Sequence, residues 1–200
     1  MKPIYIILLI LLGCNVFCQT TYDYLVSGTA KQVNGDFKGA IKDFSKIIEI
    51  DANDQIAYYY RAEAKRSLGD FTGAIKDYNK TIEIDPNEKD AYMYRGVSKF
   101  NLKDFRGAII DFNKAIEIDS TYKEAIIFRA TTKFQLKDLR GALIDSNKAI
   151  NIDSKYSKAF YLRGIIKIQI NDLEGACLDW SKAGELGQDG AYKMISEYCN

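Results

Sequence analysis

The sequence repeats itself with a fixed period of 34 residues. Gly35-Asp36-Phe37 recurs as Gly69-Asp70-Phe71, and similar tripeptides follow in the same register at residues 103–105, 137–139 and 171–173. Gly39-Ala40 also recurs four times at this spacing, each time followed by a hydrophobic residue as in Gly39-Ala40-Ile41. A period of this length indicates stacked supersecondary units, because no single unit can bury its apolar face alone. The repeats therefore predict one continuous solenoid, and the function we expect of it is binding.

The composition excludes several classes of function. The chain is 47% hydrophobic and 28% charged, which is typical of a folded protein. After Cys18 the basic and acidic residues are equal in number, which argues against nucleic acid as the main ligand. There is no histidine, and we find no phosphate-binding glycine loop, serine-nucleophile motif or metal-ligand spacing. We therefore expect no enzymatic activity, catalytic residue, cofactor or metal site.

The first 18 residues differ in kind from the rest. An unbroken apolar run over residues 4–12 follows Lys2, and it is much shorter than the roughly 20 residues of a membrane span. This pattern predicts a secretory signal. Val16-Phe17-Cys18 fits a signal-peptidase site, which would remove residues 1–18 and leave a periplasmic or secreted protein. Leu11-Leu12-Gly13-Cys14 instead resembles a bacterial lipobox; cleavage would then remove residues 1–13, and Cys14 would carry the lipid of an outer-membrane lipoprotein.

Each repeat is predicted to form two helices joined by a tight turn. In the second repeat, the first helix covers residues 56–68, and Gly69 suits the left-handed position that ends a helix. Asp70 suits the N-cap of a second helix over residues 71–83. Later repeats have other residues at the glycine position, where we expect backbone strain; they are Lys103, Lys137 and Asn171.

Apolar side chains follow a 3.6-residue period along both helices and are predicted to form the core. Small residues recur at one register position in each helix, where the helices must touch closely. In the first helices they are Gly28, Ala62, Gly96, Ala130 and Gly164; in the second helices they are Ala40, Ala74, Ala108, Ala142 and Ala176.

With these small positions, an aromatic residue after the turn aspartate and Pro86 at the end of the second repeat, the unit resembles the tetratricopeptide repeat. The resemblance implies an all-α, right-handed superhelical solenoid of five helix-turn-helix units and a short C-terminal capping helix. The units are 21–54, 55–88, 89–122, 123–156 and 157–190, and the cap is 191–200. The chain departs from the family pattern at Ile126, where an aromatic residue is usual, and has the terminal proline only once.

Charged residues also recur with the period. Arginine precedes the small residue of the first helix in the last four repeats, as in Arg61 and Arg95, and the first repeat has Ser27 there. An aspartate recurs in every second helix, as in Asp77. The alternatives are an anion-binding ladder and an Arg–Asp pair inside each repeat. We favour the pair, because a feature that is identical in every repeat serves stacking.

The resemblance also implies a binding site on the concave face, which the first helices line and which receives an extended or helical peptide. The positions carried over from the family vary between repeats and are mostly apolar, as expected of a partner-binding surface. The alternative is that many of them pack against neighbouring repeats. The predicted groove residues are Tyr59, Glu63, Arg66, Met93, Val97, Phe100, Ile127, Thr131, Phe134, Tyr161 and Ile165. They lack the lysine and asparagine with which family members grip the C-terminal carboxylate of chaperones, so we expect apolar recognition.

Two cysteines follow the leader, Cys177 and Cys199. In an oxidising compartment they are candidates for a disulfide that closes a loop of about 22 residues; the alternative is two free, buried thiols. We therefore predict a non-enzymatic scaffold of the bacterial envelope that binds a protein or peptide in its groove. The alternative is a structural factor that self-associates through the groove or an end face, near Trp180.

Overall fold

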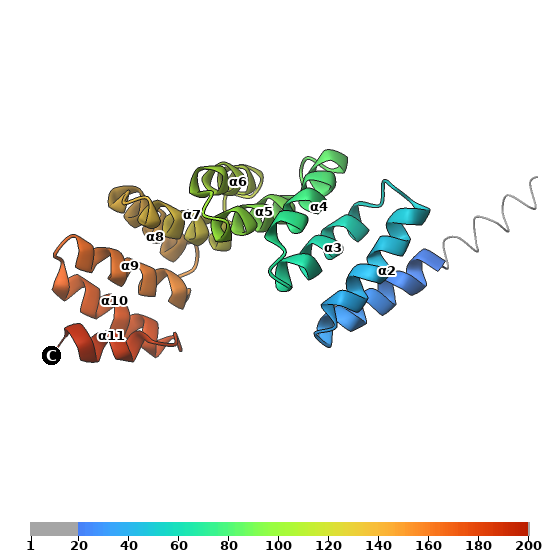
Figure 1. Cartoon of the computed structure of the whole chain (residues 1–200). Coiled ribbons are helices and arrows are strands. Elements are labelled where there is room, and N and C mark those ends of the chain that lie inside the picture. Colours follow the sequence, from blue (N-terminus) through green and yellow to red (C-terminus); the bar gives the residue numbers. More distant parts are fainter. Residues whose placement is uncertain (1–19, 200) are drawn as a thin grey trace, which may run out of the picture. The chain divides into compact units, whose positions relative to one another are not determined.

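The computed structural model describes residues 20–199, and all the regular elements among them are helices (Figure 1). Residues 20–33 form the first helix. The helices that follow are α2 (Phe37–Ile50), α3 (Gln55–Ser67), α4 (Phe71–Ile84), α5 (Lys89–Asn101), α6 (Phe105–Ile118), α7 (Lys123–Gln135), α8 (Leu139–Ile152), α9 (Ser157–Gln169), α10 (Leu173–Glu185) and α11 (Ala191–Tyr198). The predicted all-α architecture of consecutive helix pairs is confirmed.

The chain divides into two compact units within α5. The N-terminal unit ends at Tyr94 and the C-terminal unit begins at Arg95. In the N-terminal unit, α3 packs on both α2 and α4. In the C-terminal unit, each helix from α6 to α11 packs on the next one in the chain. Each unit therefore builds its core between helices that are close in sequence.

The turn within each repeat is set by one aspartate and the residue before it. The Asp70 carboxylate caps α4 by accepting a hydrogen bond from the Gly73 N–H at 2.8 Å, and the same bond recurs in all five repeats. Gly69 has φ +81°. The expected strain is present in the later repeats, where non-glycine residues adopt the same left-handed conformation; they are Lys103 (63°), Lys137 (65°) and Asn171 (61°).

Glycine in a first helix makes room for a large ring from the second helix. Phe112 is completely buried, and a β-carbon at Gly96 would lie 2.7 Å from its Cε1 atom. Gly164 faces the equally buried Trp180 in the same way, at 2.5 Å from Nε1. The predicted close contact between helices is therefore present at these positions.

The recurring charges form a hydrogen-bonded network in each repeat. Arg61 donates two hydrogen bonds to Asp77, at 2.9 and 2.8 Å, and Lys65 donates a third at 2.7 Å. Asp77 is 4% exposed, so the carboxylate is not available to an external cation. Equivalent Arg–Asp–Lys triads join Arg95, Asp111 and Lys99; Arg129, Asp145 and Lys133; and Arg163, Asp179 and Lys167. The expected Arg–Asp pair is thus confirmed, with a lysine as its third member.

The first repeat closes the same network without arginine. Ser27 donates to Asp43 at 2.7 Å and Lys31 donates at 2.6 Å. Burial alone would raise the pKa of Asp43, but these hydrogen bonds and the Lys31 charge outweigh it and lower that pKa. The serine therefore preserves the ionised aspartate at the first repeat.

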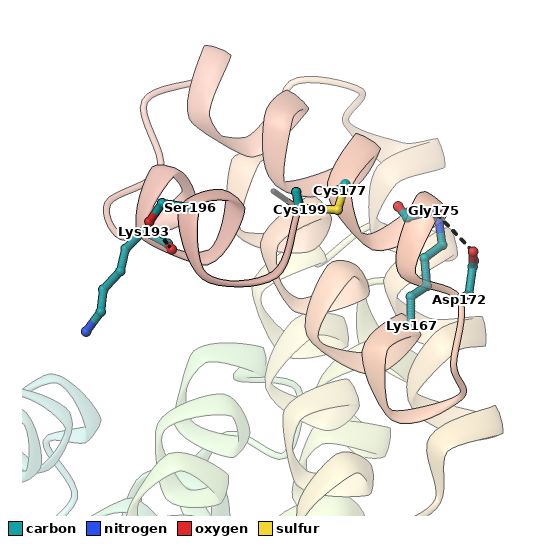
Figure 2. The surroundings of a disulfide bond; sticks show 7 residues. All are labelled: Lys167, Asp172, Gly175, Cys177, Lys193, Ser196 and Cys199. Atoms are coloured by element: carbon teal, nitrogen blue, oxygen red, sulfur yellow. Dashed lines mark hydrogen bonds between the residues drawn. A yellow bond between two sulfur atoms is a disulfide. The ribbon is translucent and has the colours of Figure 1, made fainter.

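The C-terminal helix α11 is joined to α10 by a disulfide between Cys177 and Cys199 (Figure 2). The Tyr198 ring lies 5.7 Å from the Trp180 ring, between centroids. Tyr192 is 66% exposed and Tyr198 is 40% exposed, and the fully buried residue of α11 is Ala191.

Two sequence predictions lie outside the described residues: the leader over residues 1–18 and the lipidation site at Cys14. Across residues 20–199, every helix is too short or too polar to cross a membrane. The same residues contain no group of three metal-ligating side chains.

Candidate functional site

A pocket of about 360 Å³ lies between α7 and α9 in the C-terminal unit. It brings together four predicted groove residues: Ile127, Thr131, Tyr161 and Ile165. On each helix the two residues are four positions apart and so share one face. Because α7 and α9 are first helices of successive repeats, this pocket is where the sequence predicted a partner to bind.

The walls of this pocket are mainly apolar. Ile127 and Leu162, at 7% and 8% exposed, are the most buried residues of its lining. The Thr131 hydroxyl donates to the Ile127 carbonyl at 2.9 Å, so it does not require a polar partner from a ligand. Glu124, Lys158 and Gln188 add polar groups to the lining. The pocket therefore suits an apolar side chain whose backbone can meet polar groups nearby.

Tyr156 also lines the pocket and remains neutral at physiological pH. Burial, with smaller contributions from the charges of Glu124 and Asp153, raises the pKa of Tyr156 to about 12. The Lys123 ammonium lies 5.0 Å from the centre of its ring. This phenol can therefore donate or accept a hydrogen bond without carrying charge.

In the N-terminal unit, two predicted groove residues pair with each other. Arg66 donates to both carboxylate oxygens of Glu63, at 3.1 and 3.0 Å, and Tyr78 donates to the same carboxylate. The Arg66 guanidinium also stacks over Tyr94, 5.0 Å from the ring centre. The Glu63 and Arg66 side chains are only 14% and 26% exposed. The two side chains therefore hold the helices of this unit together, and their charges are largely unavailable to a partner.

Tyr59 lines a second cleft, of about 500 Å³, in the N-terminal unit. Its ring packs edge-on against those of Tyr60, Tyr78 and Tyr94. Burial and the Glu63 charge raise the pKa of Tyr59 well above its ordinary value. The remaining residues of the cleft are Gln55, Ile56, Tyr60, Glu88 and Asp90, so this cleft is more polar than the pocket between α7 and α9.

The structure corrects the sequence prediction at two groove positions. Met93 and Val97 are 2% and 7% exposed, because neighbouring side chains cover them. They therefore belong to the core. Phe100 packs against Phe105, with ring centres 5.3 Å apart, and Phe134 lies beneath the Lys137 ammonium. Both phenylalanines are half-buried and lie outside the two cavities. They lie beside the turn between paired helices, and their place in the groove stays a prediction.

Several pocket residues were not predicted. Glu124 and Lys158 precede predicted groove residues of the same helix by three positions, so the helical period could have indicated them. Gln188 comes from the segment after α10, at the register position that Ser154 and Pro86 hold in earlier repeats, and this position does not indicate a pocket residue. Only the fold brings that segment to the pocket.

Successive helix pairs with this spacing define an α-helical repeat protein, and comparison with known families identifies its kind. The tetratricopeptide-repeat family matches residues 56–88 and, through a second profile of the same family, residues 90–122. The chain belongs to the tetratricopeptide-repeat family. The fold of this family supports protein–protein interaction.

Several solved structures share the fold at low sequence identity. MamA of Desulfovibrio magneticus RS-1 is 19% identical with a TM-score of 0.77, over 85% of this chain and 97% of that chain. The PilF structure from Pseudomonas aeruginosa is 15% identical with a TM-score of 0.77, over 86% and 78%. YrrB, described as having an unusual peptide-binding site, is 18% identical with a TM-score of 0.70, over 87% and 90%. No curated protein matches the sequence. At these identities the likeness shows the fold alone.

Proposed function

We propose that this protein is a non-enzymatic scaffold that binds a partner peptide or helix through the pocket between α7 and α9. The observation that carries the proposal is the pocket of about 360 Å³, in which four predicted groove residues meet. An apolar side chain of the partner enters between Ile127 and Ile165, and the polar groups near the pocket hold the partner's backbone. The peptide-binding site described for YrrB, which has the same fold, is consistent with this use.

The proposal is tested by closing the pocket. Peptides are selected from a random displayed library on the full chain, and their affinity is measured for Ile165→Arg and Thr131→Phe. The first variant places a charge in the pocket, and the second fills it without charge. Both should reduce affinity by about tenfold or more, since loss of one buried apolar contact costs roughly 1–3 kcal/mol.

The matched control is Gln169→Arg, which places the same charge at an exposed position of α9 outside the pocket. It should bind the peptides as the wild type does. Far-UV circular dichroism checks that each variant keeps its helices. Equal affinity for all three variants would show that the peptides bind elsewhere, and the pocket would lose its proposed role.

We further propose that the protein is exported to the bacterial envelope. The basic start and the apolar run at residues 4–12 support export, and the Cys177–Cys199 disulfide is consistent with an oxidising compartment. N-terminal sequencing of the mature protein, with metabolic palmitate labelling, distinguishes a start at Gln19 from a lipidated Cys14. An unprocessed chain that begins at Met1 would contradict export by either route.

Self-association is the second candidate function, and the exposed apolar residues near the ends of the described chain favour it. Tyr22 and Val33 of the first helix are 61% and 87% exposed, and Tyr192 of α11 is 66% exposed. Trp180 is not available for this contact, because it is fully buried. Light scattering across a concentration series would detect assembly, and a constant monomer mass would exclude it.

A further inference from the structure

The C-terminal unit exposes one aliphatic side chain at the same register position of three successive second helices. Ile110 of α6, Ile144 of α8 and Leu178 of α10 are separated by one period each. They are 67%, 58% and 66% exposed. A single exposed aliphatic residue is normal on a protein surface, but recurrence at one register position forms a stripe.

This stripe breaks the sequence period. The same register position in the N-terminal unit holds Lys42 and Lys76, and both are exposed. The surroundings of the position therefore accept a lysine, and core packing does not require an aliphatic residue there. The three aliphatic side chains need a different explanation, and contact with something outside the chain provides it.

Basic residues flank the stripe on α6 and α8, whereas on α10 Glu174 lies four positions before Leu178. Arg106 and Arg140 lie four positions before Ile110 and Ile144, and Lys148 lies four positions after Ile144. Within residues 20–199 none of these three cations forms an ion pair. Residues at i, i+4 and i+8 lie on one side of a helix, so the cations and the aliphatic side chains face the same way.

The acidic residues in and next to α8 do not contribute to this exposed side of the helix. Asp145 is 2% exposed and lies in the internal triad, and Asp138 caps the helix by accepting the Gly141 N–H. The glutamate that pairs with lysine on α6, Glu117, is replaced on α8 by Asn151. The exposed side of α8 is therefore cationic and apolar, without a carboxylate.

We propose that this outer face, defined as Arg106, Ile110, Arg140, Ile144, Lys148 and Leu178, binds the surface of an anionic lipid bilayer. Arginine and lysine attract acidic headgroups, and branched aliphatic side chains enter the boundary between headgroups and acyl chains. A fluid surface requires no shaped pocket, and a periodic arrangement suits it. Nucleic acid is less suited, because α8 has no aromatic residue for base stacking and Phe112 of α6 is buried.

The outer face uses second helices, whereas the pocket between α7 and α9 uses first helices. Membrane contact is therefore independent of the proposed peptide binding, and either can fail without the other. It also differs from a lipid anchor at Cys14, because the folded C-terminal unit itself contacts the bilayer.

The test places a reporter on the outer face of the full chain by Ile144→Trp. The native tryptophan, Trp180, is fully buried and contributes a constant background. Vesicles that contain phosphatidylglycerol should shift the new emission to shorter wavelength, and brominated acyl chains should quench it. Vesicles of phosphatidylcholine alone should do neither, and high salt should reverse the binding.

Two further variants make the test specific. Arg106→Glu together with Arg140→Glu, in the same reporter chain, should weaken vesicle binding by about tenfold or more, since each basic residue near an anionic surface contributes about fivefold. Val33→Trp, on a highly exposed residue outside the outer face, should show no shift, and it controls for attachment through the first 19 residues. An unshifted Ile144→Trp spectrum, equal response to neutral vesicles, or unchanged affinity after charge reversal would overturn the proposal. Binding of an acidic protein instead of vesicles would assign the face to a protein partner and would also overturn it.

Discussion

At the scale of single residues, the period pairs a small residue on one helix with a large one on the next. Gly96 faces Phe112 and Gly164 faces Trp180, each across a gap too small for a β-carbon. Both rings are fully buried, so they cannot move into solvent to make room. The absence of a side chain at these glycines therefore sets the distance between paired helices.

Gly96→Leu should destabilise the protein by about 1–3 kcal/mol or more, because overpacking forces the Phe112 ring and the backbone to shift. Urea unfolding followed by circular dichroism measures the change. Thr72→Leu, at an exposed position of α4, is the control and should have little effect. An unchanged urea midpoint for Gly96→Leu would contradict this prediction, because it would mean that the helices can move apart without loss of stability.

At the scale of the helices, the repeats tolerate local departures because backbone hydrogen bonds remain satisfied. Three repeats retain the left-handed turn although they lack glycine. The Asp104 N–H still donates to the Lys99 carbonyl at 2.9 Å, as Asp70 does to Lys65. The turn between repeats is also kept without proline, since Asp119 accepts the N–H of Thr121 at 3.0 Å.

Lys103→Gly should stabilise the protein by about 0.5–1 kcal/mol, because glycine adopts the left-handed conformation without a clash of its β-carbon. The reverse change, Gly69→Lys, should destabilise it by a similar amount. Both are measured as shifts in the unfolding midpoint. If Lys103→Gly lowered stability, the strain inferred from its φ of 63° would not be relieved by removing the side chain.

The disulfide should hold α11 over α10. In Cys177→Ser/Cys199→Ser, the Tyr198 ring should leave Trp180, and acrylamide should quench the tryptophan more strongly. The crosslink closes a loop of 22 residues and contributes roughly 3 kcal/mol to the stability of this end. Reduction of the wild type with a dithiol should reproduce the effect. Identical quenching in the oxidised, reduced and variant proteins would show that packing alone retains α11.

At the scale of the whole molecule, a chain with a net charge of only +1 contains two cavities of different polarity. The cleft of the N-terminal unit combines tyrosines with carboxylates, whereas the pocket of the C-terminal unit is mainly apolar. The buried tyrosines also determine how the molecule responds to alkali. Burial raises the pKa of Tyr59, Tyr78 and Tyr156, and the Glu63 charge adds to the first two.

A folded-state pKa above the unfolded value means that these phenols stabilise the folded state while they are neutral. Their contribution is complete below about pH 10 and is lost as the pH rises through the raised values. The melting temperature should therefore fall above about pH 10, and the fall should be smaller in Tyr78→Phe. Tyr22→Phe, at an exposed position, should not change it. Equal pH profiles for both variants would contradict a role for Tyr78 ionisation.

The sequence by itself determined the helices, their caps and the internal charge pairs. Each of these depends on residues a few positions apart or on a register that recurs with the period, as with Asp70 and Gly73 or Arg61 and Asp77. Only the tertiary structure decided which groove positions are accessible. Met93 and Tyr161 both belong to first helices and were predicted alike, yet Met93 is buried and Tyr161 lines a pocket. The reason is that exposure depends on the volumes of side chains from neighbouring repeats, and those are the residues that do not follow the period.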